Sequence, residues 1–544
     1  MAGGAPEREH WGTRIGFILA AAGSAVGLGN IWKFPYITGM YGGAAFVFFY
    51  LISILLIGLP VMLIEISIGR KTQLNPVGAF RALSPRGPYF LIGFLGVIAA
   101  FIILSYYSVI AGWTLSYIVK AVTGTFTHFK EPGYVMDTIA NIAGGRLGIS
   151  PGEVPWSRLD SLAALGMHAD SLTALQTVPN AALPQVSCDH LGVTWVTVDS
   201  LSGLSAIRDS LCVWKSVPDT LLPIVAGWEF SEYTSHSVWP IISHLTFIAL
   251  CVLVVIRGVK SGIERWNWIL MPILFAIIIL LVIRGVTLSG SVAGLKFLFL
   301  PDFSKLNGSV MLTALGHAFF TLSLGMGAML TYGSYLGSKE NLMKSALWII
   351  VADTGVALLA GSAIFCAVFA MGFKPAGGPG LVFNVLPGIF AVMPGGLYVG
   401  ILFFLLLSIA ALTSGVSLLE VVIAYFIDQR GWKRSRATVT WGGVIFLLGI
   451  PSVYSFGLLK GVSVFGMTIF DFLDYLSFKY LLPLGGLSMV LFTIFRWGAG
   501  GLVDELRLGG GRLVVSKWVM NVLLVIAAVF VTLTFIAGIA GWGN

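Results

Sequence analysis

Residues 23–36 have the sequence GSAVGLGNIWKFPY and interrupt an apolar segment that is otherwise long enough to cross a bilayer. Glycine and proline weaken the interior of a helix, and charged or polar side chains are costly in hydrocarbon. A break inside a membrane also frees backbone N–H and C=O groups that lipid cannot satisfy. The stretch therefore predicts an interrupted helix whose freed groups are paired by water or by a bound solute.

The composition predicts an all-α polytopic membrane protein. Of the 544 residues, 57% are hydrophobic and 10% are charged, and the mean hydropathy is +0.93. A soluble domain carries roughly a quarter charged residues, and a helix is the usual structure that crosses a membrane. The net charge of +8 does not indicate nucleic-acid binding, because the basic residues fall in short clusters between apolar segments. No removable signal peptide is expected, because the N-terminal residues lack an uninterrupted apolar region.

Eleven apolar stretches have spanning length. They cover residues 12–38, 43–69, 88–120, 239–257, 262–284, 310–336, 342–372, 397–427, 436–456, 464–495 and 514–541. Basic clusters occur mainly in the loops of one side, which is expected to be cytoplasmic. The prediction is a protein of the cell (inner) membrane with a cytoplasmic N-terminus and an extracytoplasmic C-terminus.

The long polar segment 121–238 is then extracellular and is interpreted as an elaboration rather than a catalytic domain. It holds Cys188 and Cys212, which either form a disulfide in an oxidising compartment or stay unpaired. Cys251 and Cys366 lie in apolar stretches, where a thiol behaves as a small hydrophobe. The chain has no Walker A sequence, which argues against an ATP-driven pump.

A second interruption, FFTLSLGMGAMLTY, occupies residues 319–332 of the sixth stretch. Breaks in stretches one and six lie at matching positions of two five-helix halves, which is typical of inverted-repeat transporters. We expect one transporter domain, 1–544, with repeats at 12–284 and 310–495 and an extra helix at 514–541. The alternative is that these glycines only permit close helix packing, but the matched positions favour a binding site. Half-helix N-termini attract a carboxylate, and freed carbonyls coordinate a cation.

Several motifs resemble those of the neurotransmitter:sodium symporter family. They are GSAVGLGNIWKFPY with GGAAFVFFYLISILLIGLPVMLIEISIGR for helices one and two, ILSYYSVIAGW for helix three, AFFTLSLGMGAMLTYGSY for helix six and IAALTSGVSLLE for helix eight. The resemblance covers nearly the whole chain except 121–238, and eleven helices suit the bacterial amino-acid transporter branch. It implies a 5+5 inverted-repeat fold with broken helices one and six, plus an eleventh helix.

The resemblance also implies two Na⁺ sites built from oxygen ligands. The first would contain Ala25, Asn30, Thr321 and Asp353 together with the carboxylate of the substrate. The second would contain Gly23, Val26, Ala410, Thr413 and Ser414. The two hydroxyls of the second set are weak evidence by themselves, because membrane hydroxyls usually bond the preceding helical turn.

Asp353 is an acid inside an apolar stretch, and such residues are usually functional, although structural hydrogen bonds could also satisfy it. Members of the family that bind chloride often have asparagine there. Asp353 would supply the negative charge of chloride, Ala357 lacks a hydroxyl, and His317 replaces the usual glutamine. These differences predict transport without chloride.

For the substrate, the resemblance implies a carboxylate held by the N–H groups of Leu28 and Gly29 and by the Tyr107 hydroxyl. The ammonium would contact the carbonyls of Ala25, Phe320 and Thr321 and the side chain of Ser323. The side-chain pocket would be lined by Ile103, Tyr107, Phe320, Met326, Ser414 and Leu418, with Ser24 nearby. Gly27 favours an amino acid, because members that carry monoamines have aspartate at that position. The apolar lining favours hydrophobic or aromatic side chains; Met326 either adapts to aromatic cargo or simply packs.

The resemblance places gates at both ends of the pathway. Lys33 would face Asp474 outside, and this gate is expected to be loose, because lysine lacks the planar bidentate geometry of arginine. Arg8 and Asp428 would pair inside. Glu65 and Glu420 are interpreted as orienters of unwound backbone, with proton relays as the alternative. Gly262 and Pro272 either open a water path by local unwinding or form an ordinary kink. Residues 377–387 resemble the outer hairpin of the family.

The predicted protein is a sodium-coupled symporter that imports hydrophobic or aromatic amino acids by alternating access. It is not expected to be an enzyme or to bind nucleic acid; its expected partners are an amino acid, two Na⁺ ions and the lipid bilayer. One alternative is a non-transporting sensor or a channel-like protein. Another is an intramembrane hydrolase using Ser323 or Ser414 with His317, which is disfavoured because no Gly-x-Ser-x-Gly elbow accompanies these two serines.

Overall fold

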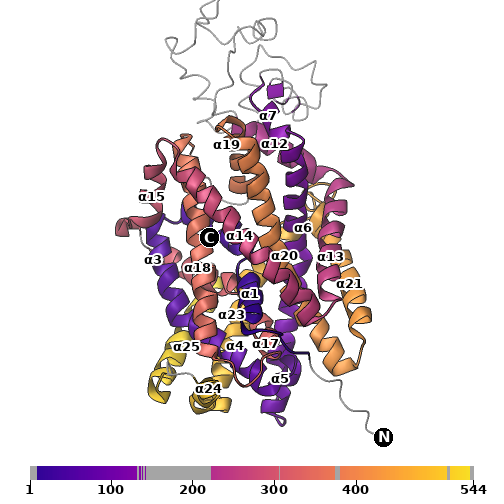
Figure 1. The fold of residues 1–544 in the computed structure, drawn as a ribbon, viewed down its shortest axis with the longest axis vertical. Coiled ribbons are helices and arrows are strands. Elements are labelled where there is room, and N and C mark those ends of the chain that lie inside the picture. The colour runs from indigo at the N-terminus through magenta and orange to yellow at the C-terminus, as the bar shows by residue number, and fades with distance from the viewer. Residues whose placement is uncertain are drawn as a thin grey trace, which may run out of the picture.

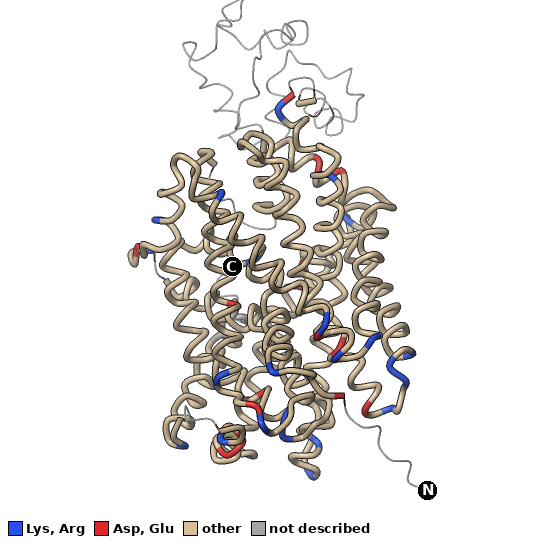
Figure 2. The backbone as a smooth tube through the Cα atoms, viewed as in Figure 1, with Lys and Arg blue, Asp and Glu red and all other residues tan. Residues whose placement is uncertain are grey.

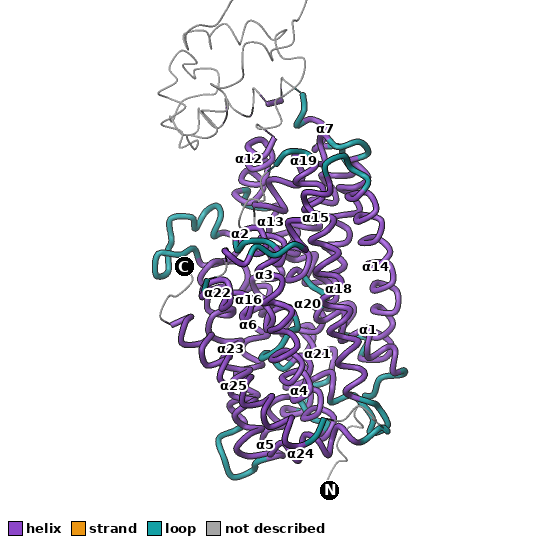
Figure 3. The backbone as a smooth tube through the Cα atoms, turned by 90° about the vertical axis from the view of Figure 1, so that its left-hand side faces the viewer, coloured by secondary structure: helices purple, strands orange, loops and turns teal. Residues whose placement is uncertain are grey.

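The computed structural model describes residues 9–131, 134–135, 138, 141, 222–305, 307–373, 380–510 and 515–539. The described residues form an elongated bundle of helices (Figure 1, Figure 3). One end of the bundle carries α7, α12 and α19, and the opposite end carries α5 and α24. The predicted all-α fold is therefore confirmed for this part of the chain.

The helices run in the following order along the chain. The α-helices are α1 (Arg14–Ala25), α2 (Phe34–Met40), α3 (Ala44–Ser53), α4 (Leu59–Thr72), α5 (Pro76–Leu83), α6 (Phe90–Val122), α7 (Thr125–His128), α12 (Leu222–Ser235), α13 (Trp239–Val255), α14 (Arg265–Val286), α15 (Ser291–Phe299), α16 (Gly308–Thr321), α17 (Ala328–Gly333), α18 (Leu342–Ala370), α19 (Leu386–Val392), α20 (Gly396–Arg430), α21 (Arg434–Tyr454), α22 (Ile469–Leu476), α23 (Leu482–Phe492), α24 (Gly498–Arg507) and α25 (Lys517–Ile539). Wider π-helical turns lie between some of them: η1 (Gly29–Lys33), η2 (Ile54–Gly58), η6 (Val259–Glu264), η8 (Leu381–Val385), η9 (Ser477–Leu481) and η10 (Thr493–Trp497). A short 3₁₀ turn, η7, covers Phe303–Lys305.

Each of the eleven predicted spans coincides with a helix or an interrupted helix. Among the described residues, seven continuous helices are long and apolar enough to cross a membrane, and two bent pairs raise that number to nine. The bent pairs are α1 with η1–α2, at 45°, and α12 with α13, at 77°. The two remaining predicted spans correspond to the broken α16–α17 segment and to α25.

Proline residues explain four of the wide turns. Pro35, Pro60, Pro387 and Pro483 each follow a π-helical turn by two residues, after η1, η2, η8 and η9. In each case the residue before the proline donates its N–H five residues back, as Phe34 does to the Gly29 carbonyl. The proline ring clashes with the carbonyl four residues earlier, and the wider turn relieves that clash.

The Gly262 and Pro272 region is wound rather than open in this conformation. Gly262 lies in η6, and α14 continues through Pro272 without a break. A Cβ on Gly262 would lie 2.2 Å from the Val254 carbonyl oxygen, so only glycine permits this approach of η6 to α13. The long outer segment 121–238 is described only near its ends, where α7 and α12 form, and Cys188 and Cys212 lie outside the described residues.

The distribution of charge supports the predicted orientation. Figure 2 shows that lysine and arginine gather mainly at the end of the bundle that carries α5 and α24. Basic residues are enriched on the cytoplasmic side of membrane proteins. The cytoplasmic assignment of this end remains a prediction.

A buried ion pair joins this end of α4 to α24. The Arg70 Nε lies 2.7 Å from Glu505 Oε1, and both side chains are almost fully buried. The Arg70 guanidinium also donates to the carbonyls of Glu340 and Glu505. The bridge therefore attaches the amphipathic helix α24 to the base of the bundle.

We expect Glu505→Ala to lower the free energy of unfolding by about 3–5 kcal/mol, because it leaves the Arg70 guanidinium buried without a counter-charge. Asp504→Ala is the matched control. Asp504 is 61% exposed and pairs with Arg507 and Lys517 at the surface, so its loss should cost at most about 1 kcal/mol. Thermal unfolding of the detergent-purified variants measures both effects, and equal midpoints would contradict the structural role of the pair.

Candidate functional site

The first helix break is built from residues 26–28. Helix α1 ends at Ala25, Val26 is extended with φ −72° and ψ 91°, and η1 begins at Gly29. The Gly27 N–H, freed by the break, donates to Asn30 Oδ1 at 3.0 Å. The Leu28 N–H donates to the Tyr107 hydroxyl of α6 at 3.3 Å. Side chains therefore satisfy backbone groups that the bilayer could not satisfy.

The second break lies between α16 and α17. Ser323, Gly325 and Gly327 all have positive φ, at 54°, 81° and 75°, and for a serine this conformation is strained. The Ser323 hydroxyl donates to the Ser24 carbonyl at 2.8 Å, which joins the two breaks. Glu65 of α4 accepts the N–H groups of Gly325 at 2.7 Å and Leu330 at 3.3 Å. Glu65 thus orients unwound backbone, in agreement with the sequence prediction.

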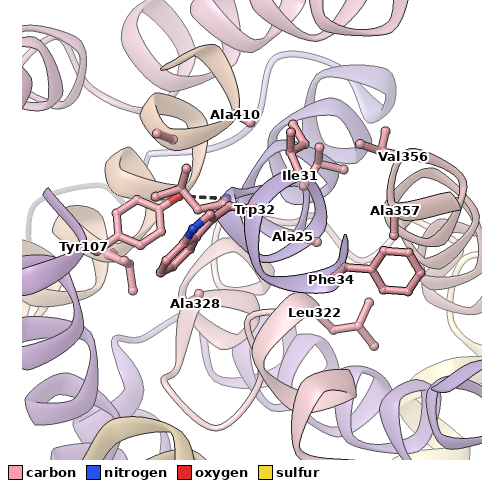
Figure 4. Close-up of a cluster of buried hydrophobic side chains, with 14 of the residues drawn as sticks. Ala25, Ile31, Trp32, Phe34, Tyr107, Leu322, Ala328, Val356, Ala357 and Ala410 are labelled. Atoms are coloured by element: carbon pink, nitrogen blue, oxygen red, sulfur yellow. Dashed lines mark hydrogen bonds between the residues drawn. The ribbon is translucent and has the colours of Figure 1, made fainter. Parts of the chain in front are cut away.

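A small cavity lies against the two breaks, α6 and α20. Twelve of the thirteen predicted substrate residues line it: Ser24, Ala25, Gly27, Leu28, Gly29, Ile103, Tyr107, Phe320, Ser323, Met326, Ser414 and Leu418. The other predicted residue, Thr321, is adjacent in sequence to Phe320 and contacts Asp353 instead. In Figure 4, Tyr107 points toward the interrupted segment that carries Ala25 and Trp32.

Glycine at position 27 keeps this cavity open. A Cβ there would lie 2.5 Å from the Ser414 hydroxyl and 3.2 Å from the Tyr107 hydroxyl. Real Cβ atoms do not approach other atoms that closely, so any side chain at this position would displace its neighbours or fill the cavity.

Asp353 is the centre of a buried polar cluster beside the cavity. Its Oδ1 accepts from Asn30 Nδ2 at 2.8 Å and from the Thr321 hydroxyl at 3.0 Å. The Tyr50 hydroxyl donates to Oδ2 at 3.4 Å. In the part of the chain that the structure describes, no lysine or arginine pairs with this carboxylate. The structure therefore brings together Asn30, Thr321 and Asp353 of the first predicted sodium set, next to Ala25 at the break.

Residues of the second predicted sodium set also lie close together, where α1 contacts α20. The Ser414 hydroxyl donates to the carbonyls of Gly23 at 3.2 Å and Ser24 at 3.0 Å. A Cβ on Gly23 would lie 3.1 Å from Thr413 Cβ. The Thr413 hydroxyl bonds the preceding turn, at Ile409 and Ala410, which is the common behaviour of membrane hydroxyls. Val26 follows α1 as its cap residue and lies in the break.

Comparison with known proteins identifies the family. Residues 8–132 and 229–542 match the profile of the Sodium:neurotransmitter symporter family. The chain belongs to this family. It is therefore a sodium-dependent membrane transporter and not an enzyme.

Relatives of the symporter match over almost its full length. It is 36% identical over 499 residues to the uncharacterized sodium-dependent transporter YhdH of Bacillus subtilis (strain 168), covering 92% of this chain and 90% of that protein. It is 32% identical over 496 residues to an uncharacterized sodium-dependent transporter of Haemophilus influenzae, covering 90% and 89%. The crystal structure of MhsT in complex with L-phenylalanine is 38% identical, covers 98% of this chain and 100% of that chain, and superimposes with a TM-score of 0.75. This match confirms the predicted fold class.

The ion pair predicted for the outer gate of the symporter is formed. Lys33 Nζ lies 3.2 Å from both carboxylate oxygens of Asp474. The ammonium also lies over the rings of Phe320, at 4.6 Å, and Phe478, at 4.2 Å. These cation–π contacts add to the attraction of the ion pair. The buried lysine therefore has four contacts here, although it lacks the planar geometry of arginine.

An aromatic cluster closes the same end, and the sequence analysis missed it. Phe383 of η8 stacks on Phe230 of α12, with ring centroids 5.2 Å apart and an interplanar angle of 11°. Both rings contact Trp113 of α6 edge-on, at 5.7 Å and 5.0 Å. The aromatic residues of 222–235 were the available signal, but nothing in the sequence indicates which distant rings they meet.

The predicted inner end is closed by the segment that precedes α1. The Trp11 indole donates to the Tyr332 carbonyl at 2.9 Å. Glu264 accepts the Gly12 N–H at 2.6 Å and the Thr13 hydroxyl at 2.8 Å. Asp428 accepts the Asn75 N–H at 2.8 Å, and its predicted partner, Arg8, lies outside the described residues.

The interpretation of Glu420 as an orienter of unwound backbone is wrong. Among the described residues, the hydrogen-bond partners of Glu420 are side chains and not backbone N–H groups. Glu420 instead binds the Arg434 guanidinium at 2.8 Å and 3.0 Å and accepts the Tyr335 hydroxyl at 2.6 Å. Arg434 also reaches Glu9 at 3.1 Å. The sequence analysis did not predict a role for Arg434, because that role depends on the contact of α20, α21 and the N-terminal segment.

We expect Glu65→Leu to destabilise the fold, because it leaves the N–H groups of Gly325 and Leu330 buried without acceptors, at a cost of about 1–3 kcal/mol each. Glu65→Gln is the matched control, since it keeps one oxygen acceptor at the same place. Thermal unfolding in detergent compares the two variants. The assigned role would be wrong if both variants unfolded at the wild-type temperature.

Proposed function

We propose that this symporter imports hydrophobic or aromatic amino acids together with Na⁺ by alternating access. The observation that carries the proposal is the cavity between the two helix breaks, with the Asp353 cluster beside it. Phe320 lines the cavity and the adjacent Thr321 bonds Asp353. A solute in the cavity and a cation at Asp353 would therefore be neighbours, which is the requirement for coupling their binding.

The carboxylate of the amino acid would bind at Leu28, Gly29 and Tyr107. The Leu28 N–H now donates to the Tyr107 hydroxyl, and a carboxylate would replace that oxygen as the acceptor. The Tyr107 hydroxyl would then donate to the same carboxylate. The freed N–H groups at the start of the η1–α2 helix favour negative charge. The ammonium would contact the carbonyls of Ala25, Phe320 and Thr321 and the hydroxyl of Ser323.

The apolar wall of the cavity supports a hydrophobic or aromatic cargo. Ile103, Phe320, Met326 and Leu418 contribute this wall, and none of the described residues that line the cavity is acidic or basic. A flexible thioether such as that of Met326 adapts to rings of different size. The related structure that holds L-phenylalanine supports the same substrate class.

Two sodium sites and no chloride site are proposed. A buried carboxylate whose partners are neutral groups is costly, and a Na⁺ ion between Asn30, Thr321 and Asp353 would offset that cost. The negative charge of Asp353 would make a bound anion unnecessary. His317 replaces the glutamine that is usual in the family, so that amide is not available to an anion here. The His317 ring packs instead among the rings of Phe34, Phe46 and Tyr50, at 5.9, 6.0 and 5.3 Å.

In the conformation described here, both ends of the pathway are closed around the cavity. Such a state supports a gating cycle in which each end opens in turn. The Lys33–Asp474 pair and the aromatic cluster close one end, and Trp11 with Glu264 closes the other. The segment before α1 would be cytoplasmic, at the basic end of the bundle (Figure 2). Opening the outer contacts would admit cargo, and opening the inner contacts would release it.

The proposal predicts Na⁺-dependent accumulation of apolar amino acids. Purified protein in proteoliposomes should concentrate radiolabelled phenylalanine, leucine or related amino acids under an inward Na⁺ gradient, and should not do so when K⁺ replaces Na⁺. A screen of the twenty amino acids identifies the cargo, and charged amino acids provide the control. Binding without accumulation would indicate a sensor, and equilibration without accumulation would indicate a passive pore.

The role of Asp353 predicts that Asp353→Asn raises the Na⁺ concentration for half-maximal uptake by at least about tenfold, which corresponds to about 1.4 kcal/mol. The variant should also become stimulated by chloride, since an anion can restore the missing charge. Uptake measured in chloride and in gluconate tests both effects. Asp302→Asn removes an exposed acid outside the site and should not change uptake. Unchanged Na⁺ dependence in Asp353→Asn would contradict the assigned role.

A further inference from the structure

Asn267, at the start of α14, has a buried amide group that is only half satisfied. The side chain is 2% exposed. Its Nδ2 donates to the Ile263 carbonyl at 2.9 Å, whereas its Oδ1 has no hydrogen-bond partner among the described residues. A carbonyl can only accept, so the nitrogen must face Ile263, and the orientation of the amide is unambiguous.

The unpartnered oxygen faces Gly23. A Cβ on Gly23 would lie 2.3 Å from Asn267 Oδ1, 3.1 Å from Thr413 Cβ and 3.2 Å from Met271 Sδ. The amide oxygen therefore occupies the space that a side chain at position 23 would need. Gly23 and Thr413 both belong to the second proposed sodium set, so Asn267 approaches this set from α14, a helix that the set does not otherwise include.

A neutral oxygen in this place suits a sodium ion. A buried acceptor without a donor costs about 1–3 kcal/mol, and such exceptions need an explanation. Hard monovalent cations bind amide, hydroxyl and carbonyl oxygens. The Asn267 amide oxygen lies against the Cα of Gly23, whose carbonyl accepts the Ser414 hydroxyl. Sodium would satisfy the oxygen that the protein leaves without a partner.

The other end of the amide is attached to the wide turn η6. Ile263 belongs to η6, where its N–H bonds the Gly258 carbonyl, five residues earlier. The N-terminal segment contacts the same turn, because Glu9 accepts the Val259 N–H at 2.5 Å and Glu264 accepts the Gly12 N–H. Asn267 thus connects the second sodium set to the turn that holds the inner end closed.

We propose that Asn267 is a positioning residue that couples occupation of the second sodium site to the winding of η6; this inference rests on the proposed function. Sodium holds the amide oxygen beside Gly23, and the amide nitrogen then holds the Ile263 carbonyl and keeps η6 wound. When the ion leaves, the amide is released and η6 opens a path for water at the inner end.

Hydrogen exchange and sodium binding together test this coupling. In wild-type protein, Na⁺ should slow amide exchange over residues 258–264 relative to K⁺, with ²²Na⁺ binding measured in parallel. Asn267→Leu keeps the branched shape of the side chain but removes both polar atoms. It should abolish the Na⁺-dependent protection of η6 and weaken ²²Na⁺ binding about tenfold, the effect expected for about 1.4 kcal/mol.

Asn267→Asp separates the two ends of the amide. It keeps an oxygen facing Gly23 but has no N–H for Ile263, so it should bind ²²Na⁺ at least as tightly as wild type while η6 loses its Na⁺-dependent protection. Ser452→Ala in α21 is the matched control, because the Ser452 hydroxyl is also buried without a partner among the described residues but lies outside the sodium sets. It should behave as wild type in both assays. If Asn267→Leu does not purify as a monodisperse protein, the comparison of Asn267→Asp with Asn267→Ser replaces it.

Wild-type Na⁺ binding and η6 protection in Asn267→Leu would overturn the inference and would show that the oxygen needs only a water molecule. Failure of the proposed function has a different signature. In that case wild-type protein would accumulate no amino acid in proteoliposomes, whatever Na⁺ does to η6. Accumulation by wild type with unchanged η6 protection in Asn267→Leu would instead remove only the role of Asn267.

Discussion

The structure depends on the pairing of backbone groups that two helix breaks release inside a bilayer. Lipid offers these groups no partners, so the protein supplies them. Asn30 accepts the Gly27 N–H, Tyr107 accepts the Leu28 N–H, and Glu65 accepts the Gly325 N–H. These partners come from the break itself, from α6 and from α4, so the breaks hold their shape only while the surrounding helices stay in place.

The same pairing places the cavity and the cation sets together. The Ser323 hydroxyl and the Ser414 hydroxyl both donate to the Ser24 carbonyl, so both broken segments and α20 meet at one atom. A solute that displaces one of these bonds therefore acts on all three elements. Trp11 lies just before α1 and Lys33 lies in η1, after the break, and they belong to the predicted inner and outer closures. A movement of the first broken helix therefore affects both closures.

The sequence analysis predicted the spans and both breaks correctly because these features follow from local chemistry. Apolar length predicts the helices, and glycine with proline predicts where they are interrupted. It did not predict the Glu420–Arg434 pair or the contact between Phe230 and Phe383, which joins segments more than a hundred residues apart. It also did not predict the wide turns before Pro35, Pro60, Pro387 and Pro483, although the position of each proline was a usable signal.

By itself, the sequence determined that this is a membrane protein with two interrupted helices, because apolar length and backbone-breaking residues act locally. Its motifs also indicated the family and the residues of the site. Only the tertiary structure decided that the Glu65 carboxylate accepts N–H groups of unwound backbone while the Glu420 carboxylate binds a guanidinium. It also decided that the Asn267 oxygen faces Gly23. The physical reason is that a buried polar group is defined by its partner, and the partners of these groups lie on other helices.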